Sequence, residues 1–167
     1  MEQRECIIDI TYKCQSNCRY CQWSEKHGHD IPLKLLLLPQ SFIDTTEIHK
    51  IVLSGGEPLL YPDLFELIDY YAKLESIDEI VIMTNGLKCT QEVALKLVKK
   101  GVTTIVFSVD SIDPMKYLLT RGLKKNAFKC VINNLMSIAH QTEREYTVGI
   151  NVVLTRVNFS VDDVFSI

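Results

Sequence analysis

"EIVIMTNGLKCTQEVALKLVKKGVTTIVFSVDS", residues 79–111, contains the unit that decides the fold. Its two apolar runs, at 79–83 and 104–109, are short and almost continuous, which is typical of strands buried on both faces. Between them, Thr90 precedes a helical pattern as a cap and Gly101 follows it as a C-terminal stop. The stretch therefore predicts a strand, a helix and a second strand parallel to the first.

The same alternation extends in both directions along the chain. Further apolar runs are CIIDI at 6–10, KIVL at 50–53 and VGINVVL at 148–154. Apolar residues at helical spacing lie between the runs: Leu64, Leu67, Ile68, Tyr71 and Ala72; Val93, Ala94, Leu97 and Val98; Phe128, Val131, Ile132, Leu135 and Ala139. The sequence predicts an α/β fold with about five parallel strands, in one domain over residues 1–167. The closing NFSVDDVFSI is expected to begin another helix, capped by Asn158 or Ser160, so the carboxyl-terminal part of the fold is expected to be missing.

Composition narrows the class of protein. The chain has 167 residues, of which 47% are hydrophobic and 23% charged, and its 18 basic and 21 acidic residues give a formal charge of −3 without a basic stripe. Nucleic acid is therefore not an expected partner. The longest apolar stretch, Ile31 to Leu38, is too short to span a membrane. We expect a cytoplasmic protein, in which clustered cysteines are metal or cluster ligands rather than disulfides.

Three of the six cysteines lie within eight residues, in KCQSNCRYCQW at 13–23. Cys14, Cys18 and Cys21 follow the first strand, at the end where α/β proteins place their chemistry. Two objects suit them: a structural zinc ion completed by His27 or His29, or an iron-sulfur cluster that leaves one iron without a protein ligand. The cysteines alone leave both open. The scattered Cys6, Cys89 and Cys130 are expected to be small core residues.

Motifs on successive strands extend this pattern. CQSNCRYC resembles the Cys-x-x-x-Cys-x-aromatic-Cys motif of the radical S-adenosylmethionine (SAM) superfamily, with Tyr20 in the aromatic place. SGGEP at 54–58, TNG at 84–86 and SVDS at 108–111 follow the second, third and fourth strands, and INVVL at 150–154 lies in the fifth. The resemblance covers nearly the whole chain. It is closest to the branch that includes the molybdenum-cofactor biosynthesis enzyme and the peptide maturases with a SPASM domain.

The resemblance implies an enzyme with a partial (β/α) barrel. In it Cys14, Cys18 and Cys21 hold a 4Fe-4S cluster whose open iron chelates SAM. A reductant such as flavodoxin or ferredoxin supplies the electron that cleaves SAM to methionine and a 5′-deoxyadenosyl radical, which abstracts hydrogen from a substrate. The substrate, a small molecule or a peptide, is not indicated.

The resemblance also assigns contacts with SAM. Gly55 and Gly56 allow close backbone approach, and Glu57 meets the amino group of the methionine. Ser108 binds its carboxylate and Arg121 is the charged partner, although an exposed helix cation is an equal interpretation of Arg121.

Other predicted contacts have structural alternatives. Asp110 accepts a hydrogen bond from ribose or substrate, or caps a turn, which we favour slightly. Thr84 and Asn85 reach the cofactor or simply form an Asn-Gly turn. Asn151, polar within an apolar strand, needs a partner such as a ribose hydroxyl. Tyr20 and Trp23 shelter the adenine or the cluster, or only pack.

Two features depart from the family pattern. The helix after the cysteines must come from LPQSFIDTTEIH, at 38–49, and is expected to be short. The fifth strand is expected to have an open edge, covered by a partner or by a missing segment.

The sequence leaves three hypotheses for the function of the chain: a radical SAM enzyme, a zinc-stabilised structural domain, and a cluster-binding remnant without turnover.

Overall fold

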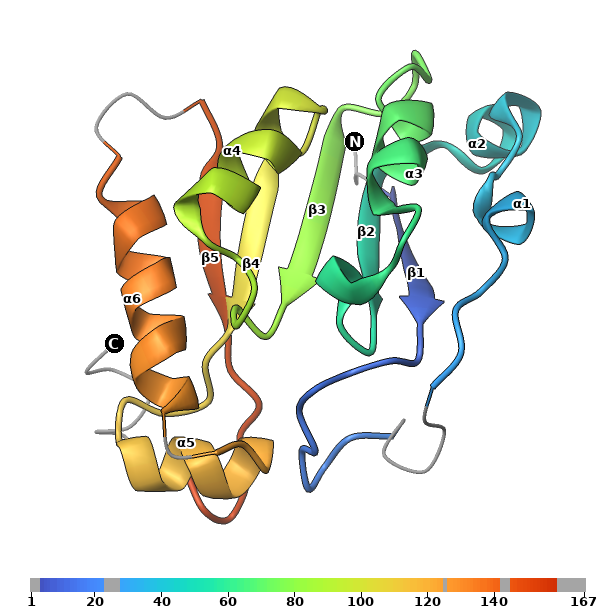
Figure 1. Cartoon of the computed structure of the whole chain (residues 1–167). Coiled ribbons are helices and arrows are strands. Elements are labelled where there is room, and N and C mark those ends of the chain that lie inside the picture. Colours follow the sequence, from blue (N-terminus) through green and yellow to red (C-terminus); the bar gives the residue numbers. More distant parts are fainter. Residues whose placement is uncertain (1–3, 23–27, 125, 142–144, 159–167) are drawn as a thin grey trace.

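The computed structural model describes residues 4–22, 28–124, 126–141 and 145–158, which contain one five-stranded sheet. All strands are parallel and follow the order β1-β2-β3-β4-β5. They are β1 (Arg4–Thr11), β2 (Ile48–Gly55), β3 (Glu79–Thr84), β4 (Thr104–Ser108) and β5 (Thr147–Asn151) (Figure 1). The sequential order is that of a (β/α) barrel, since doubly wound sheets reverse their order. The predicted α/β class with five parallel strands is confirmed.

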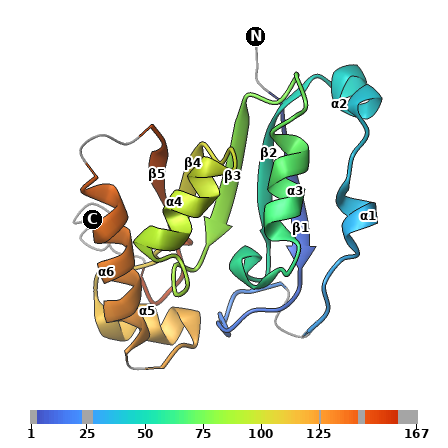
Figure 2. The ribbon, with the colours of Figure 1, turned by 45° about the horizontal axis from the view of Figure 1, so that its top comes forward.

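Three helices cover one face of the sheet. They are α3 (Leu64–Tyr71), α4 (Gln91–Lys99) and α6 (Ala127–Ala139), and Figures 1 and 2 show them on the same side. Shorter helices connect the rest: α1 (Leu33–Leu36), α2 (Gln40–Thr46), the 3-10 turn η1 (Pro58–Leu60) and α5 (Pro114–Arg121). In both views α5 lies beyond the carboxyl ends of the strands rather than over the sheet. The prediction of a short helix after the cysteines is confirmed by the seven residues of α2.

The hydrophobic core lies between the sheet and these helices. Leu53, Ile82 and Phe107 point to it from the strands and are fully buried, as are Leu67 and Leu97 from the helices. The apolar periods predicted for the three helices therefore face the sheet. Their burial is the main contribution to stability, at about 25 cal/mol per Å² of apolar surface.

The predicted helix ends agree in part with the structure. Thr90 accepts a hydrogen bond from the backbone N–H of Val93 (3.3 Å), and Gly101 takes a positive φ of 115° after α4. The helix predicted to be capped by Asn158 or Ser160 lies outside the described residues. The Asn158 side chain is described. Its amide donates to the carbonyls of Asp110 (2.5 Å) and Val153 (3.0 Å).

The sheet face opposite the core carries the polar residues of the strands. Because side chains alternate along a strand, Asp9, Ser54, Ser108 and Asn151 share this face near the carboxyl ends. The register pairs Asp9 with Ser54 and Ser108 with Asn151. At the amino ends of the strands, Lys50 forms ion pairs with the carboxylates of β1 and β3. The strands thus carry ion pairs near their amino ends and the polar side chains of this face near their carboxyl ends.

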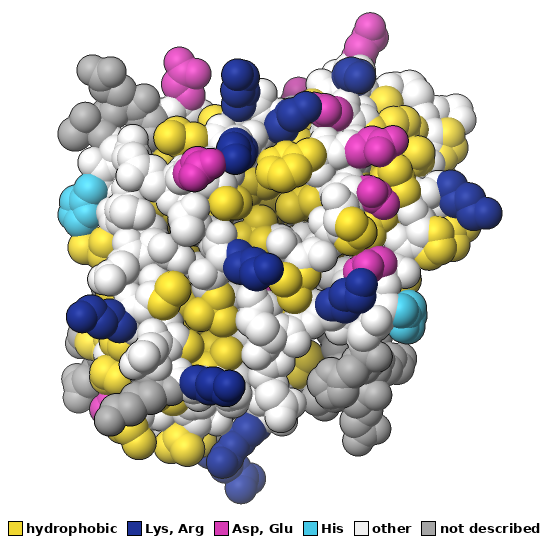
Figure 3. Space-filling view, in the orientation of Figure 1, with side chains coloured by type: hydrophobic (Ala, Val, Ile, Leu, Met, Phe, Trp, Pro, Cys, Tyr) yellow, Lys and Arg dark blue, Asp and Glu magenta, His cyan; other side chains and the backbone are white. Residues whose placement is uncertain are grey.

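Among the described residues, no helix has both the length and the apolar character to cross a bilayer. Over the upper half of the face in Figure 3, basic and acidic side chains are interspersed, and pairs such as Lys100 with Asp69 (2.5 Å) join them.

Candidate cofactor site

The cysteine loop, defined here as residues 12–22, leaves β1 at Thr11 and is closed at its base. The Thr11 hydroxyl donates to the Asp30 carboxylate (2.7 Å), and the Tyr12 N–H donates to the carbonyl of His29 (2.9 Å). The Lys13 ammonium adds an ion pair with Asp30 (2.5 Å). These contacts bring the chain back beside the end of β1, so residues 12 and 29 lie together at the base of the loop.

The glycines after β2 pack against the start of the cysteine loop. The Gly56 N–H donates to the carbonyl of Thr11 (2.6 Å), and the Glu57 N–H donates to that of Lys13 (2.8 Å). Gly55 has a φ of 116°, and a Cβ there would lie 2.5 Å from the Thr11 carbonyl oxygen. A Cβ on Gly56 would collide with the Lys13 carbonyl. These two glycines therefore allow close contact with the backbone of the cysteine loop, whereas the prediction was close contact with a ligand.

The other side of the cysteine loop is fixed to the end of α5. The backbone N–H groups of Asn17 and Arg19 donate to the carbonyls of Arg121 (3.0 Å) and Thr120 (3.1 Å). Gly122 ends α5 with a φ of 60°, and a side chain there would collide with the Asn17 carbonyl. This clamp was not predicted from the sequence, although a glycine after a helical pattern is its visible mark.

Cys14, Cys18 and Cys21 all line one cavity of about 480 Å³ at the carboxyl ends of the strands. Burial raises the pKa of the Cys18 thiol, Arg121 opposes this, and the nearby Cys14 and Cys21 thiols raise it further. Cys18 thus lies near both of the other cysteines of the loop. The Cys14 sulfur also accepts from the Ser16 N–H (3.4 Å) and from the Asn85 side-chain amide (3.8 Å).

The alternative of a structural zinc ion needs a fourth ligand from His27 or His29. The His29 ring packs edge-on against Tyr12, with 4.8 Å between ring centroids, and His27 lies outside those residues. Within the described ranges, no three Cys, His, Asp or Glu side chains are placed to hold a single metal ion. The donor set instead fits an iron-sulfur cluster, which prefers thiolates and accepts N–H hydrogen bonds at sulfur, and the cavity has room for a group larger than an ion.

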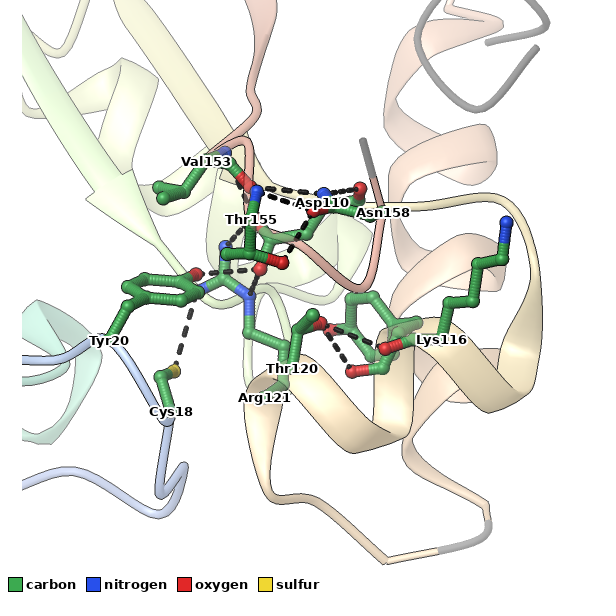
Figure 4. Close-up of polar contacts among 10 residues, drawn as sticks. Cys18, Tyr20, Asp110, Lys116, Thr120, Arg121, Val153, Thr155 and Asn158 are labelled. Carbon is green, nitrogen blue, oxygen red and sulfur yellow. Dashed lines mark hydrogen bonds and ion pairs between the residues drawn. The ribbon is translucent and has the colours of Figure 1, made fainter. Parts of the chain in front are cut away.

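Behind Cys18 lies a buried ion pair between Arg121 and Asp110 (Figure 4). The Arg121 Nε lies 2.7 Å from Asp110 Oδ2, and its Nη2 donates to Oδ1 (3.0 Å). The same carboxylate accepts from the Tyr20 hydroxyl (2.6 Å) and the Val153 N–H (3.1 Å). Arg121 is only 6% exposed, so its interpretation as an exposed helix cation is wrong. The Asp110 carboxylate is used in these contacts, and the cap of α5 is Asp113.

Glu57 joins the ends of β2 and β3. Its carboxylate is fully buried and accepts from the Thr84 hydroxyl (2.6 Å), the Asn85 N–H (2.7 Å) and the Leu59 N–H (3.1 Å). Burial raises its pKa, and these donors oppose the rise. The carboxylate predicted to meet the amino group of SAM is therefore engaged within the protein.

Most of the predicted contact residues surround the cavity. Those that line it are Tyr20, Gly55, Gly56, Thr84, Asn85, Ser108, Arg121 and Asn151. Glu57 and Asp110 stand behind this wall. Asn85 combines both of its interpretations, because its side-chain oxygen accepts from the Leu87 N–H (3.0 Å) within the turn while its amide faces Cys14. Trp23 lies outside the described residues.

Sequence reasoning missed one acid on the cavity wall and misplaced one cysteine. Asp9 lines the cavity, and burial raises its pKa; the mark of this in the sequence is an acid inside the apolar run CIIDI. Cys130 was expected in the core but is exposed on α6, where its sulfur faces the Leu87 carbonyl (3.7 Å). Cys89 is buried as expected.

A parallel α/β sheet with a three-cysteine loop at the carboxyl end of its first strand defines a class of cofactor-binding domain. The sequence pattern of the Radical SAM superfamily matches residues 8–164, and the chain belongs to this superfamily.

Two relatives illustrate the similarity in sequence. The chain is 34% identical over 116 residues to GTP 3′,8-cyclase of Aquifex aeolicus, an alignment that covers 65% of this chain and 36% of that protein. It is 32% identical over 165 residues to the probable GTP 3′,8-cyclase of Methanococcus maripaludis, covering 93% and 49%. The chain thus spans about half the length of these relatives, or less.

Solved structures of similar fold include proteins with SAM bound. The structure described as native anSMEcpe with bound AdoMet has a TM-score of 0.73 at 19% identity, covering 97% of this chain and 47% of that one. Streptococcus suis SuiB bound to S-adenosylmethionine has a TM-score of 0.67 at 19% identity, covering 92% and 35%. At this identity the likeness concerns the fold alone.

Proposed function

We propose that this chain is the core domain, over residues 1–167, of a radical SAM enzyme. Cys14, Cys18 and Cys21 would hold a 4Fe-4S cluster, and SAM would occupy the cavity that they line. The observation that carries the proposal is that three thiols and the polar ends of β2 to β5 face the same cavity. When bound, the cluster supplies the electron that cleaves SAM to methionine and a 5′-deoxyadenosyl radical, which abstracts hydrogen from the substrate.

The protein's own residues would bind and orient SAM. Ser108 and Asn151, neighbours in the register of β4 and β5, offer a hydroxyl and an amide to carboxylate or ribose oxygens. Gly55 and Gly56 offer backbone groups on the opposite side of the cavity. Thr84 and Asn85 lie on the wall at the end of β3, and Tyr20 on the cysteine loop.

The name of the relatives makes GTP one candidate substrate, but the described cavity wall offers little for a triphosphate. Arg121 is the one Lys or Arg side chain among the described lining residues, and Asp110 neutralises it. Asp9 adds negative charge to the same wall. We therefore propose only a small-molecule or peptide substrate, with a low-potential reductant such as flavodoxin or ferredoxin in a cytoplasmic setting.

The test is anaerobic reconstitution of the full chain with iron and sulfide, followed by reduction in the presence of SAM. We expect about four irons per chain and release of 5′-deoxyadenosine. A chain that binds the cluster without releasing 5′-deoxyadenosine would be a remnant, and this outcome would refute the enzymatic proposal.

A pair of cysteine variants identifies the ligands. Cys18→Ala should abolish the colour of the cluster, because it removes a sulfur that lines the cavity. Cys130→Ala is the matched control, since this thiol is exposed on α6 away from the three clustered cysteines. Equal loss of iron from both variants would show that the wrong thiols are assigned.

A further inference from the structure

The Arg121 side chain lies behind Cys18 and contacts both the cysteine sulfur and Asp110. We propose that Arg121, held in place by Asp110, sets the reduction potential of the cluster through a hydrogen bond to the sulfur of Cys18. This inference rests on the proposed function, because it needs the cluster at the three cysteines. Asp110 orients Arg121, and its own carboxylate charge acts directly on the cluster with the opposite sign.

The geometry divides the guanidinium between two partners. Its Nε and Nη2 both face the Asp110 carboxylate, at 2.7 and 3.0 Å. The remaining nitrogen, Nη1, donates to Cys18 Sγ at 3.8 Å. Figure 4 shows the side chain between the carboxylate and the sulfur. The Nη2 hydrogen bond and the close ion pair at Nε thus hold the guanidinium against the carboxylate, while Nη1 donates to the cysteine.

Four hydrogen bonds, from the cysteine loop and from the segment after β5, hold the pair together. The Tyr20 hydroxyl comes from the cysteine loop itself, and the Val153 N–H comes from the segment after β5; both donate to the Asp110 carboxylate. The carbonyl of Asp110 accepts from the Asn158 amide, and the carbonyl of Arg121 accepts from the Asn17 N–H. The Asp110 side chain is fully buried and that of Arg121 is 7% exposed. Neither group is free to rotate toward water.

Electrostatics gives the two residues opposite effects on the cluster. One-electron reduction by an external donor adds negative charge to the cluster and its sulfur ligands. A cation and an N–H donor at Cys18 stabilise that charge, which raises the potential, while the Asp110 carboxylate opposes it. Screening by water is weak at this burial, so neither effect is averaged away. Removal of the guanidinium should therefore lower the potential, and removal of the carboxylate charge should raise it.

This role differs from the contact with the SAM carboxylate that the family resemblance implies for Arg121. If Arg121 acted only as a ligand of SAM, its replacement would change the affinity for SAM. The reduction potential of the cluster in the absence of SAM would then stay unchanged. The potential measured in the absence of SAM therefore separates the two roles.

The experiment is a redox titration of the reconstituted full chain without SAM, with dithionite as reductant and the reduced cluster followed by electron paramagnetic resonance. The variants are Arg121→Gln and Asp110→Asn. Lys100→Gln is the control, because it removes a cation that pairs with Asp69 on the surface. We expect Arg121→Gln to shift the midpoint to more negative potential, Asp110→Asn to shift it to more positive potential, and Lys100→Gln to leave it unchanged.

The result that would overturn the proposal is a midpoint equal to wild type in both variants, or shifted in the same direction, at wild-type iron content. If Arg121→Gln loses iron, Arg121→Lys decides, because it keeps the charge but not the planar fork; its midpoint should lie below that of wild type. Loss of iron from both Arg121 variants would also count against the proposal, because it would show that the Arg121–Asp110 pair is needed for cluster assembly. A wild-type chain that binds no cluster would instead refute the proposed function.

Discussion

At the scale of single residues, the buried carboxylates of the site are bonded to groups of the protein itself. Glu57 accepts three hydrogen bonds from groups on β3 and η1, and Asp110 holds Arg121. A buried carboxylate is tolerated only where such donors offset its loss of hydration. Glu57 and Asp110 therefore support the cavity wall from behind and hold the carboxyl ends of the strands in place.

The role of Glu57 as a brace predicts a loss of stability in Glu57→Gln. The amide replaces one accepting oxygen by an NH₂ group that faces N–H or O–H donors, so at least one hydrogen bond is lost in a buried place. We expect the free energy of unfolding to fall by about 1–3 kcal/mol. Urea unfolding of the cluster-free chain measures it, and an unchanged midpoint would show that Glu57 does not brace the two strands.

The element that matters most for the site is the cysteine loop, which is held at three places. Its base is closed at Asp30, its start packs on the glycines after β2, and its middle is bonded to the end of α5. All three contacts use groups other than the cysteine sulfurs. The loop is therefore arranged for its ligand role before any cluster is present.

The clamp between the cysteine loop and α5 predicts a strong effect of Gly122→Ala. The new methyl group would meet the Asn17 carbonyl, and φ of 60° is unfavourable for alanine by about 1–2 kcal/mol. We expect a lower iron content after reconstitution. Gly28→Ala is the matched control, because Gly28 also has a positive φ, 106°, but a methyl group there would meet no atom of the described residues within 4 Å. Equal iron in the two variants would contradict the clamp.

The glycines after β2 allow a second test at this scale. Gly56→Ala places a methyl group against the Lys13 carbonyl, directly before Cys14. The start of the cysteine loop must then move, and we expect a loss of iron with a smaller effect on the unfolding midpoint of the cluster-free chain. Iron that stays at the wild-type level would show that the contact is not needed to position Cys14.

At the scale of the whole molecule, the fold divides into a core face that stabilises it and a carboxyl edge that carries the site. Leu97 of α4 is fully buried in the core and is absent from the cavity wall. We expect Leu97→Ala to lower the free energy of unfolding by about 2–5 kcal/mol. Iron content below the unfolding transition should remain that of wild type, and a parallel loss of iron would contradict the separation of core and site.

The architecture could be predicted because it depends on local periodicity. Apolar runs such as those at 79–83 and 104–109 are strands of the sheet, and the apolar faces of α3, α4 and α6 pack on it. The three cysteines could be found in the same way, since their spacing is unusual and follows a strand. Both inferences need only the neighbours of each residue along the chain.

The partners of buried charges could not be predicted, because they depend on contacts between distant residues. The sequence left Arg121 equally open to a cofactor contact and to an exposed helix position, but α5 lies beyond the strand ends and turns this residue toward Cys18, 103 positions earlier. Cys130 sits in an apolar helical pattern, yet it falls on the outer side of α6. Periodicity alone predicts neither where a helix lies relative to the sheet nor how deeply each of its side chains is buried.

The central claim is that three thiols hold a cluster and leave one iron open to SAM. The most direct measurement is the electron paramagnetic resonance spectrum of the reduced, reconstituted chain before and after SAM is added. We predict that SAM changes the g values of the cluster, because a new ligand reaches the open iron, and that Ser108→Ala raises the SAM concentration needed. A spectrum that SAM leaves unchanged, from a chain with full iron content, would contradict the account.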